Sequence, residues 1–200
     1  GNNKDGIDFS LEDDYYGDTR FHIPFIAWYQ VMNASLALTT MEVLKDRIPV
    51  TMEQLQAGIA NTRWQGRMET ILPGVIVDGA HNEDGVRRFV ETAERFQKEY
   101  PLTLLFSAVN DKDYQDMIHT ICSRIKFRKV VTTEVGGYRE VPSAELAEIF
   151  CKEGCKDVGN SDNIEEAFHM AHEAKGEDGM LFCVGSLYLV GEIKTLLLKK

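Results

Sequence analysis

A short polar cluster follows an apolar run near the middle of the chain. Val75-Ile76-Val77 is followed by Asp78-Gly79-Ala80-His81-Asn82, which brings a carboxylate, an imidazole and an amide within five residues. Such groups accept hydrogen bonds and, in the case of histidine, exchange protons near neutral pH. A helix cap explains one of Asp78 and Asn82, and a lone His81 is more often an ordinary loop residue. Their density favours a functional site.

Three further loops with polar or glycine residues follow apolar runs. They are Ser107–Asp113, which contains Asp111, Lys112 and Asp113; Thr133–Tyr138, which contains Gly136 and Gly137; and Gly185–Ser186. Alone, Ser186 is equally well explained as a helix cap, and the Asp-Lys-Asp string as a solvated turn. Ligands of open parallel sheets bind beyond the carboxyl ends of the strands. We therefore expect the 78–82, 110–113 and 185–186 loops to meet along one edge of a sheet.

The elements that must position these loops alternate between strands and amphipathic helices, from about Arg67 to the C-terminus. This alternation predicts an α/β fold with a mostly parallel sheet and helices on both faces. The predicted strands are 66–72, 75–77, 102–106, 127–132 and 180–184. Helical spacing predicts helices near 86–96, 117–125, 143–150, 164–171 and 187–198.

The first sixty residues have a different pattern. We interpret residues 2–18 as a loose, acidic entry segment and residues 19–27 as a strand, which Pro24 places at an edge. Apolar residues at helical spacing predict a helix over residues 29–46, outside the sheet. Thr51, with Gln54 three residues later, predicts a capping box at the start of a short helix.

Composition narrows the class of protein. The 200 residues carry 22 basic and 32 acidic side chains, a net charge of −10. This charge argues against nucleic-acid binding through a broad basic surface. No apolar stretch approaches the roughly 20 residues of a membrane span, and the four cysteines are best interpreted as reduced thiols rather than a zinc site. We expect a cytoplasmic protein without a membrane partner.

Four motifs, in order along the chain, together resemble one family. "GRMETILPGVIVDGAHNEDGVRRF" resembles the start of the C-terminal domain of folylpolyglutamate and dihydrofolate synthases, which belong to the Mur ligase superfamily. "YQVMNASLAL" is similar to the end of the family's central ATPase domain. "SAVNDKDYQDM" and "VGSLYLVGEI" are similar to its Asp-Lys-Asp and closing Gly-Ser-Leu-Tyr segments.

The resemblance implies a Rossmann-like domain over residues 63–200, preceded by the end of the central domain over residues 1–62. It implies a ligase that uses ATP and Mg²⁺ to join L-glutamate to the γ-carboxylate of a folate through an acyl phosphate. This ligase would be monomeric, with its metal ligands mostly outside this chain. In these roles Asn33 and Arg67 contact ATP, Asp78 its ribose, His81 acts in catalysis, and Ser186 lines the glutamate pocket. Further loop contributors are Asn82, Asp111, Lys112 and Asp113.

The chain departs from the family pattern in a few places. Tyr29-Gln30 stands where members often have His-Gln, and Asn82-Glu83 where Asn-Pro is common. No G-x-x-x-x-G-K-[ST] or G-x-G-x-x-G phosphate-binding loop is present in these 200 residues. Two alternatives therefore stay open: the C-terminal domain of another Mur-type amino-acid ligase, and a non-catalytic nucleotide-binding module. A phosphate loop encoded upstream would favour a ligase.

Overall fold

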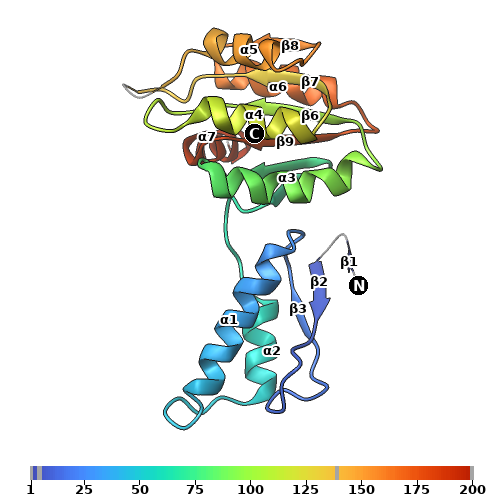
Figure 1. Ribbon diagram of the computed structural model, residues 1–200, viewed down its shortest axis with the longest axis vertical. Helices are drawn as coiled ribbons and strands as arrows, with labels where there is room; N and C mark the ends of the chain where they lie inside the picture. The colour runs from blue at the N-terminus through green and yellow to red at the C-terminus, as the bar shows by residue number, and fades with distance from the viewer. Residues whose placement is uncertain (1, 4–5, 138–139, 199–200) are drawn as a thin grey trace. The chain divides into compact units, whose positions relative to one another are not determined.

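The computed structural model describes residues 2–3, 6–137 and 140–198. The chain divides into two compact units, Gly1–Gln65 and Gly66–Lys200, whose elements are labelled in Figure 1. The boundary expected from the sequence lies between residues 62 and 63. The assignment of the first unit to a central ATPase domain stays a prediction.

The N-terminal unit combines a small antiparallel sheet with two helices. The predicted capping box is confirmed: Thr51 Oγ1 accepts the N–H of Gln54, and Gln54 Oε1 accepts the N–H of Thr51. The interpretation of residues 2–18 as a loose segment was wrong in part, because residues 6–9 form a strand whose Ile7 is buried. The elements are β1 (Asn2–Asn3), β2 (Gly6–Phe9), β3 (Phe21–Ile23), α1 (Tyr29–Val43) and α2 (Met52–Ala60).

The C-terminal unit is built on a six-stranded sheet with the order β4-β5-β9-β6-β7-β8. Only β4 runs antiparallel to its neighbour, so the predicted mostly parallel α/β fold is confirmed. The strands are β4 (Glu69–Leu72), β5 (Val75–Asp78), β6 (Leu102–Phe106), β7 (Phe127–Thr132), β8 (Val158–Asn160) and β9 (Met180–Val184). The helices are α3 (Glu83–Gln97), α4 (Tyr114–Arg124), α5 (Ser143–Lys152), α6 (Ile164–Lys175) and α7 (Leu187–Leu198).

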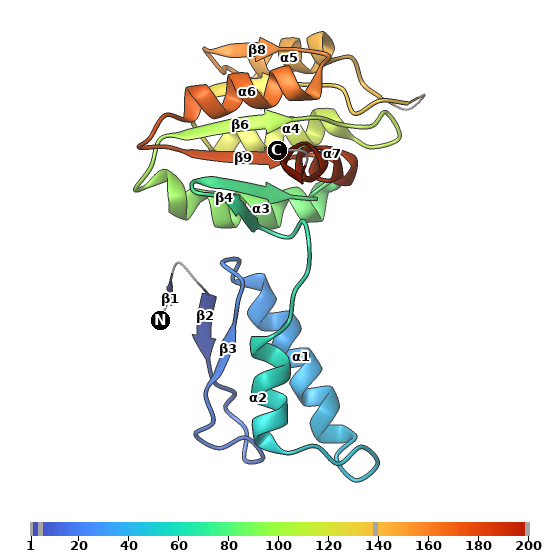
Figure 2. The same cartoon turned by 180° about the vertical axis from the view of Figure 1, so that it is seen from behind.

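Helices cover both faces of this sheet, as predicted. Figure 1 shows α3, α4 and α5 in front of the strands, and Figure 2 shows α6 and α7 on the other side. Side chains alternate along each buried strand, so β9 sends Phe182 toward α3 and Cys183 into the cluster with α6 and α7. Within the described ranges, no helix is long and apolar enough to cross a membrane.

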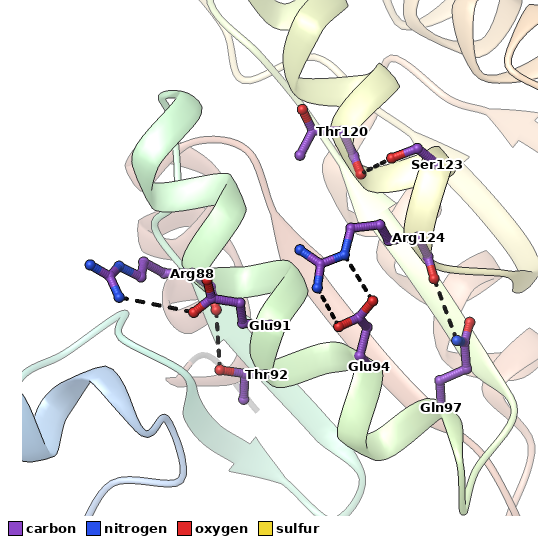
Figure 3. Close-up of polar contacts among 8 residues, drawn as sticks. All are labelled: Arg88, Glu91, Thr92, Glu94, Gln97, Thr120, Ser123 and Arg124. Atoms are coloured by element: carbon purple, nitrogen blue, oxygen red, sulfur yellow. Dashed lines mark hydrogen bonds and ion pairs between the residues drawn. The ribbon is translucent and has the colours of Figure 1, made fainter.

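Polar contacts join α3 and α4 on the solvent side of the core (Figure 3). The guanidinium of Arg124 donates to both carboxylate oxygens of Glu94, with N–O distances of 2.8 and 2.6 Å. Gln97 donates from Nε2 to the carbonyl oxygen of Arg124 at 3.5 Å. These contacts lie close to where β7 begins, away from the ends of the strands that carry the polar loops. Such partly exposed pairs contribute little to stability, on the order of 0–1 kcal/mol.

We predict that Phe182→Ala lowers the free energy of unfolding by about 3–5 kcal/mol, because the substitution leaves a cavity in the core. The Phe182 ring is fully buried and meets the rings of Phe89 and Phe96 edge-on, with centroids 5.5 and 5.7 Å away. Urea unfolding followed by circular dichroism measures the change. Leu198→Ala is the control, since Leu198 is 87% exposed. A loss below about 1 kcal/mol for Phe182→Ala would contradict the proposed packing of this core.

Candidate functional site

The predicted convergence of the polar loops is confirmed by the sheet. Asp78 and Phe106, the last residues of β5 and β6, both pair with Val184 at the end of β9, and Phe106 also pairs with Thr132. The loops that follow these strands therefore lie side by side along one edge. The Gly185–Ser186 loop lies between the other two, and it is close to Ser107: a Cβ at Gly185 would overlap the Ser107 carbonyl oxygen.

Several predicted site residues turn out to be helix caps at this edge. Asn82 Oδ1 accepts the N–H of Gly85 at 2.8 Å, and Asp113 Oδ1 accepts the N–H of Asp116 at 3.3 Å. Ser186 Oγ likewise accepts the N–H of Tyr188 at 3.1 Å, and Ser186 is only 2% exposed. The N-termini of α3, α4 and α7 thus all lie at the same edge. Their partial positive charges suit anionic groups such as phosphates and carboxylates.

Asp78 is buried and bonded to the backbone. Its Oδ2 accepts the N–H of Met68 and its Oδ1 the N–H of Ala80, both at 2.8 Å, and the residue is 3% exposed. Burial raises the pKa of Asp78 from 3.8 to about 6, although the two backbone amides and the charge of Arg67 oppose the rise. The carboxylate therefore holds the turn around Arg67 against the end of β5 at an electrostatic cost.

Arg67 lies in a turn whose backbone is unusually constrained. Gly66 and Met68 on either side of it have φ of +68° and +46°, and Met68 is the only non-glycine with positive φ among the described residues. The N–H of Gly79 donates to the carbonyl oxygen of Gly66 at 2.7 Å. A left-handed methionine costs on the order of 1–3 kcal/mol, which the surrounding hydrogen bonds must offset. The conformation of this turn therefore depends on the hydrogen bonds that surround it.

The imidazole of His81 has a defined tautomer. Its Nδ1 lies 2.6 Å from the carbonyl oxygen of Gly79, and a carbonyl oxygen only accepts hydrogen bonds. Nδ1 must therefore carry the hydrogen. In the neutral ring, Nε2 is left with a lone pair and can accept a proton or a hydrogen bond. His81 is half-buried at the start of the loop that leads into α3.

The positions of the other predicted site residues say less about a function. Asn33 lies on the exposed side of α1, in the N-terminal unit, where its Nδ2 donates to Gln30 Oε1 at 2.8 Å. Asp111 is exposed and Lys112 is half-buried in the loop after β6. Gly136 and Gly137 have positive φ, whereas Tyr138 lies outside the described residues. The left-handed conformation of Met68 could not be predicted, because a methionine carries no sequence signal for a left-handed turn.

The described residues do not include a cluster of three or more His, Cys, Asp or Glu side chains arranged to hold a metal ion. Cys151 and Cys155 are four residues apart in the sequence but do not share a helix face, because α5 ends at Lys152. Cys155 instead approaches Cys122 of α4, with 3.6 Å between the sulfur atoms. All four cysteines are free thiols.

Comparison with known proteins identifies relatives over most of the chain. Residues 66–187 match the family described as "Mur ligase, glutamate ligase domain". A dihydrofolate synthase/folylpolyglutamate synthase of Bacillus subtilis is 30% identical over 194 residues, which cover 93% of this chain and 43% of the relative. The chain thus spans less than half the length of this relative.

Comparison with solved structures also identifies similar proteins. A Mycobacterium tuberculosis folylpolyglutamate synthase, determined with ADP and AMPPCP, superimposes with a TM-score of 0.75 at 25% identity, covering 88% of this chain and 42% of that one. An Escherichia coli protein named FolC, determined with ADP, has a TM-score of 0.79 and covers 98% of this chain and 47% of that one. Its 16% identity supports the fold alone.

We predict that Asp78 makes the stability of the protein depend on pH. A carboxyl group with a raised pKa in the folded state stabilises the protein most below its unfolded pKa, and this contribution is lost as the pH rises through the folded pKa. A rise from 3.8 to about 6 corresponds to about 3 kcal/mol. The free energy of unfolding of the wild type, minus that of Asp78→Asn, should therefore fall by about 3 kcal/mol between about pH 3 and pH 7.

Urea unfolding at several pH values measures this difference. Asp84→Asn is the matched control, because the Asp84 side chain is 66% exposed on α3. A difference between wild type and Asp78→Asn that stays constant with pH would show that Asp78 ionises normally in the folded protein.

Proposed function

Because the chain belongs to the Mur ligase, glutamate ligase domain family, we propose that it is the C-terminal part of an ATP-dependent folylpolyglutamate synthase. In this proposal ATP phosphorylates the γ-carboxylate of a folate, and the amine of L-glutamate then attacks the acyl phosphate. The new C–N bond forms as phosphate leaves. The Bacillus subtilis relative, named dihydrofolate synthase/folylpolyglutamate synthase, and the structure with ADP and AMPPCP support this choice of reaction and nucleotide.

One observation carries the proposal: three helix N-termini and Arg67 are gathered at the carboxyl edge of the sheet. ATP, the acyl phosphate and glutamate are all anions. The positive ends of these helix dipoles favour such ligands without requiring a strongly basic surface, and the chain as a whole carries a net charge of −10. The Mur-type function and the local charge of the edge therefore agree.

We assign the nucleotide side of this edge to Arg67 and Asp78, and the ATP contact of Asn33, which lies in the N-terminal unit, stays a separate prediction. The guanidinium of Arg67 suits a phosphate or a stacked base. The carboxylate of Asp78 has lone pairs beyond the two used by Met68 and Ala80, and one of them would accept a ribose hydroxyl. Because Asp78 is only 3% exposed, its larger effect on ATP is expected to pass through the Arg67 turn that it holds.

We assign the glutamate side to His81, Ser186 and the loop containing Lys112. Glutamate arrives with an ammonium group, which must lose a proton before its nitrogen can attack. His81 Nε2, left unprotonated by the Nδ1 hydrogen bond to Gly79, would accept that proton. The Ser186 hydroxyl keeps its hydrogen for donation, since its oxygen accepts from Tyr188. Asn82, Asp111 and Asp113 would shape the surrounding loops.

Magnesium ions would neutralise charge on the transferring phosphoryl group. The described residues do not include a cluster suited to holding this ion, so its ligands are expected on the remainder of the ligase. The phosphate-binding loop is likewise expected on the remainder of the ligase. An acyl phosphate must also be protected from water, which a second domain that closes over the nucleotide would provide.

We predict that the 200-residue chain alone folds but does not ligate glutamate to folate. Phosphoryl transfer needs backbone that cradles phosphates and a held metal ion. A single wall of the cleft should bind ATP with a dissociation constant in the millimolar range or weaker, equivalent to about 4 kcal/mol or less. Calorimetry with ATP, and phosphate release with folate and glutamate present, test this. Ligation by the chain alone would contradict the prediction.

In the full-length ligase we predict separate effects for two substitutions. Arg67→Ala should raise KM for ATP about tenfold or more, since a hydrogen bond to a charged group is worth roughly 1.5–3 kcal/mol. His81→Ala should lower kcat about 10²-fold or more and change KM for ATP little, because it removes a proton acceptor. Steady-state kinetics of phosphate release measure both.

Arg88→Ala is the control, because Arg88 lies on α3 and pairs only loosely with Glu91, at 3.9 Å (Figure 3). Replacing folate by other carboxylate acceptors, and glutamate by other amino acids, separates this function from that of another Mur-type ligase. Nucleotide binding without any acceptor-dependent turnover would favour the non-catalytic module instead.

A further inference from the structure

Glu69, the first residue of β4, connects two segments that are far apart in the sequence. Its Oε2 accepts the backbone N–H of Gly66 at 2.7 Å. The ammonium of Lys194 in α7 donates to Oε1 and Oε2 at 2.8 and 3.0 Å. The two side chains are 29% and 26% exposed, so solvent screens this pair less than a fully exposed one. One carboxylate thus links α7 to the turn that carries Arg67.

Helix α7 also packs directly against this turn. A Cβ added at Gly66 would lie 3.1 Å from Cγ1 of Val190, and a Cβ added at Gly79 would overlap Cδ2 of Leu187. Val190 and Lys194 are four residues apart, so they lie on the same face of α7. The apolar contact and the ion pair therefore act on the same piece of backbone.

The turn around Arg67 is expected to change its conformation if these contacts are lost. Met68, which follows Arg67, has a φ of +46°, a left-handed conformation that methionine rarely adopts without support from its surroundings. Three acceptor contacts hold the turn: Asp78 takes the N–H of Met68, Glu69 takes the N–H of Gly66, and the Gly66 carbonyl takes the N–H of Gly79. Lys194 in turn limits where the Glu69 carboxylate can lie.

We propose that Glu69 and Lys194 are positioning residues for nucleotide binding, which fix Arg67 relative to the first turn of α7. The pair makes the nucleotide side of the edge, at Arg67, and the glutamate side, at Ser186, parts of one rigid unit. Neither residue needs to touch a substrate. The inference rests on the proposed function, because Arg67 must contact ATP for its position to matter.

The test is steady-state kinetics of the full-length ligase with ATP as the varied substrate. Lys194→Met and Glu69→Leu should each raise KM for ATP about 3- to 10-fold and leave kcat within about twofold, the pattern of lost uniform binding. Lys194→Arg should keep the wild-type KM. Because Lys194 acts through Glu69, the Glu69→Leu/Lys194→Met double variant should be no worse than Glu69→Leu alone.

An exchange of charges distinguishes positioning from simple stabilisation. The Glu69→Lys/Lys194→Glu variant restores an ion pair but leaves the Gly66 N–H without its carboxylate acceptor. We expect its Tm to recover toward the wild-type value while KM for ATP stays raised. Recovery of both Tm and KM would overturn the positioning role. Glu69→Gln, whose amide oxygen still accepts the Gly66 N–H, provides a milder variant if Glu69→Leu does not fold, and its KM should lie between those of the wild type and the charge-exchanged variant.

Arg124→Met is the matched control, because it breaks the comparable ion pair with Glu94 between α3 and α4 (Figure 3). It should lower Tm slightly and leave KM for ATP unchanged. Arg67→Ala tests the proposed nucleotide site separately from the positioning role of Glu69 and Lys194. If Arg67→Ala leaves KM for ATP unchanged, the proposed nucleotide site fails. If Arg67→Ala raises KM while Lys194→Met, Glu69→Leu and Glu69→Gln do not, the site stands and the positioning inference is overturned.

Discussion

The parallel pairing of β5, β9, β6 and β7 is the constraint on which the rest of the structure depends. Asp78, Val184, Phe106 and Thr132 end their strands level with one another, so each following loop starts at the same edge. A slip of one residue in any pairing would exchange the side chains that this strand sends to the two covered faces of the sheet, and it would shift the loop that follows. The core contacts of Phe182 and Cys183 on opposite faces resist such a slip. The core contacts therefore fix the register of the strands, and the register determines where the polar groups lie at the edge of the sheet.

Two features of this edge lower the stability of the folded protein. Asp78 is a carboxylate with almost no exposure, and Met68 has a backbone conformation that methionine disfavours. Neither feature improves the core. Each is held by neighbouring hydrogen bonds, and Asp78 supplies one of the bonds that hold Met68. Buried charge and strain that support each other in this way are common where a protein must keep a side chain, here Arg67, in one place.

Much of this architecture could be predicted from the sequence, because the signals are local. The apolar runs, the helical spacing and the Thr51–Gln54 capping box each lie within a few residues, and the order of strands and helices predicted both the fold and the shared edge. Short elements escaped prediction: β8 has three residues, one of them Gly159, and β2 has four. Glu69 and Lys194 could not be paired at all, since 125 residues separate them and neither belongs to a local pattern. Asp78, Asn82 and Ser186 were recognised as important, but their hydrogen bonds to backbone amides depend on how the chain returns on itself.

The place of β9 in the sheet has a further consequence for how the protein is made. β9 lies between β5 and β6, although both of those strands precede it by more than seventy residues in the chain. During synthesis β5 can pair with β4, and β6 with β7, but the two pairs cannot be joined into one sheet until residues 180–184 have left the ribosome. A chain stopped before β9 would lose a central strand rather than an edge, and would expose two apolar strands to unwanted pairing. β9, which is made after the other strands of this sheet, thus completes both its core and its functional edge.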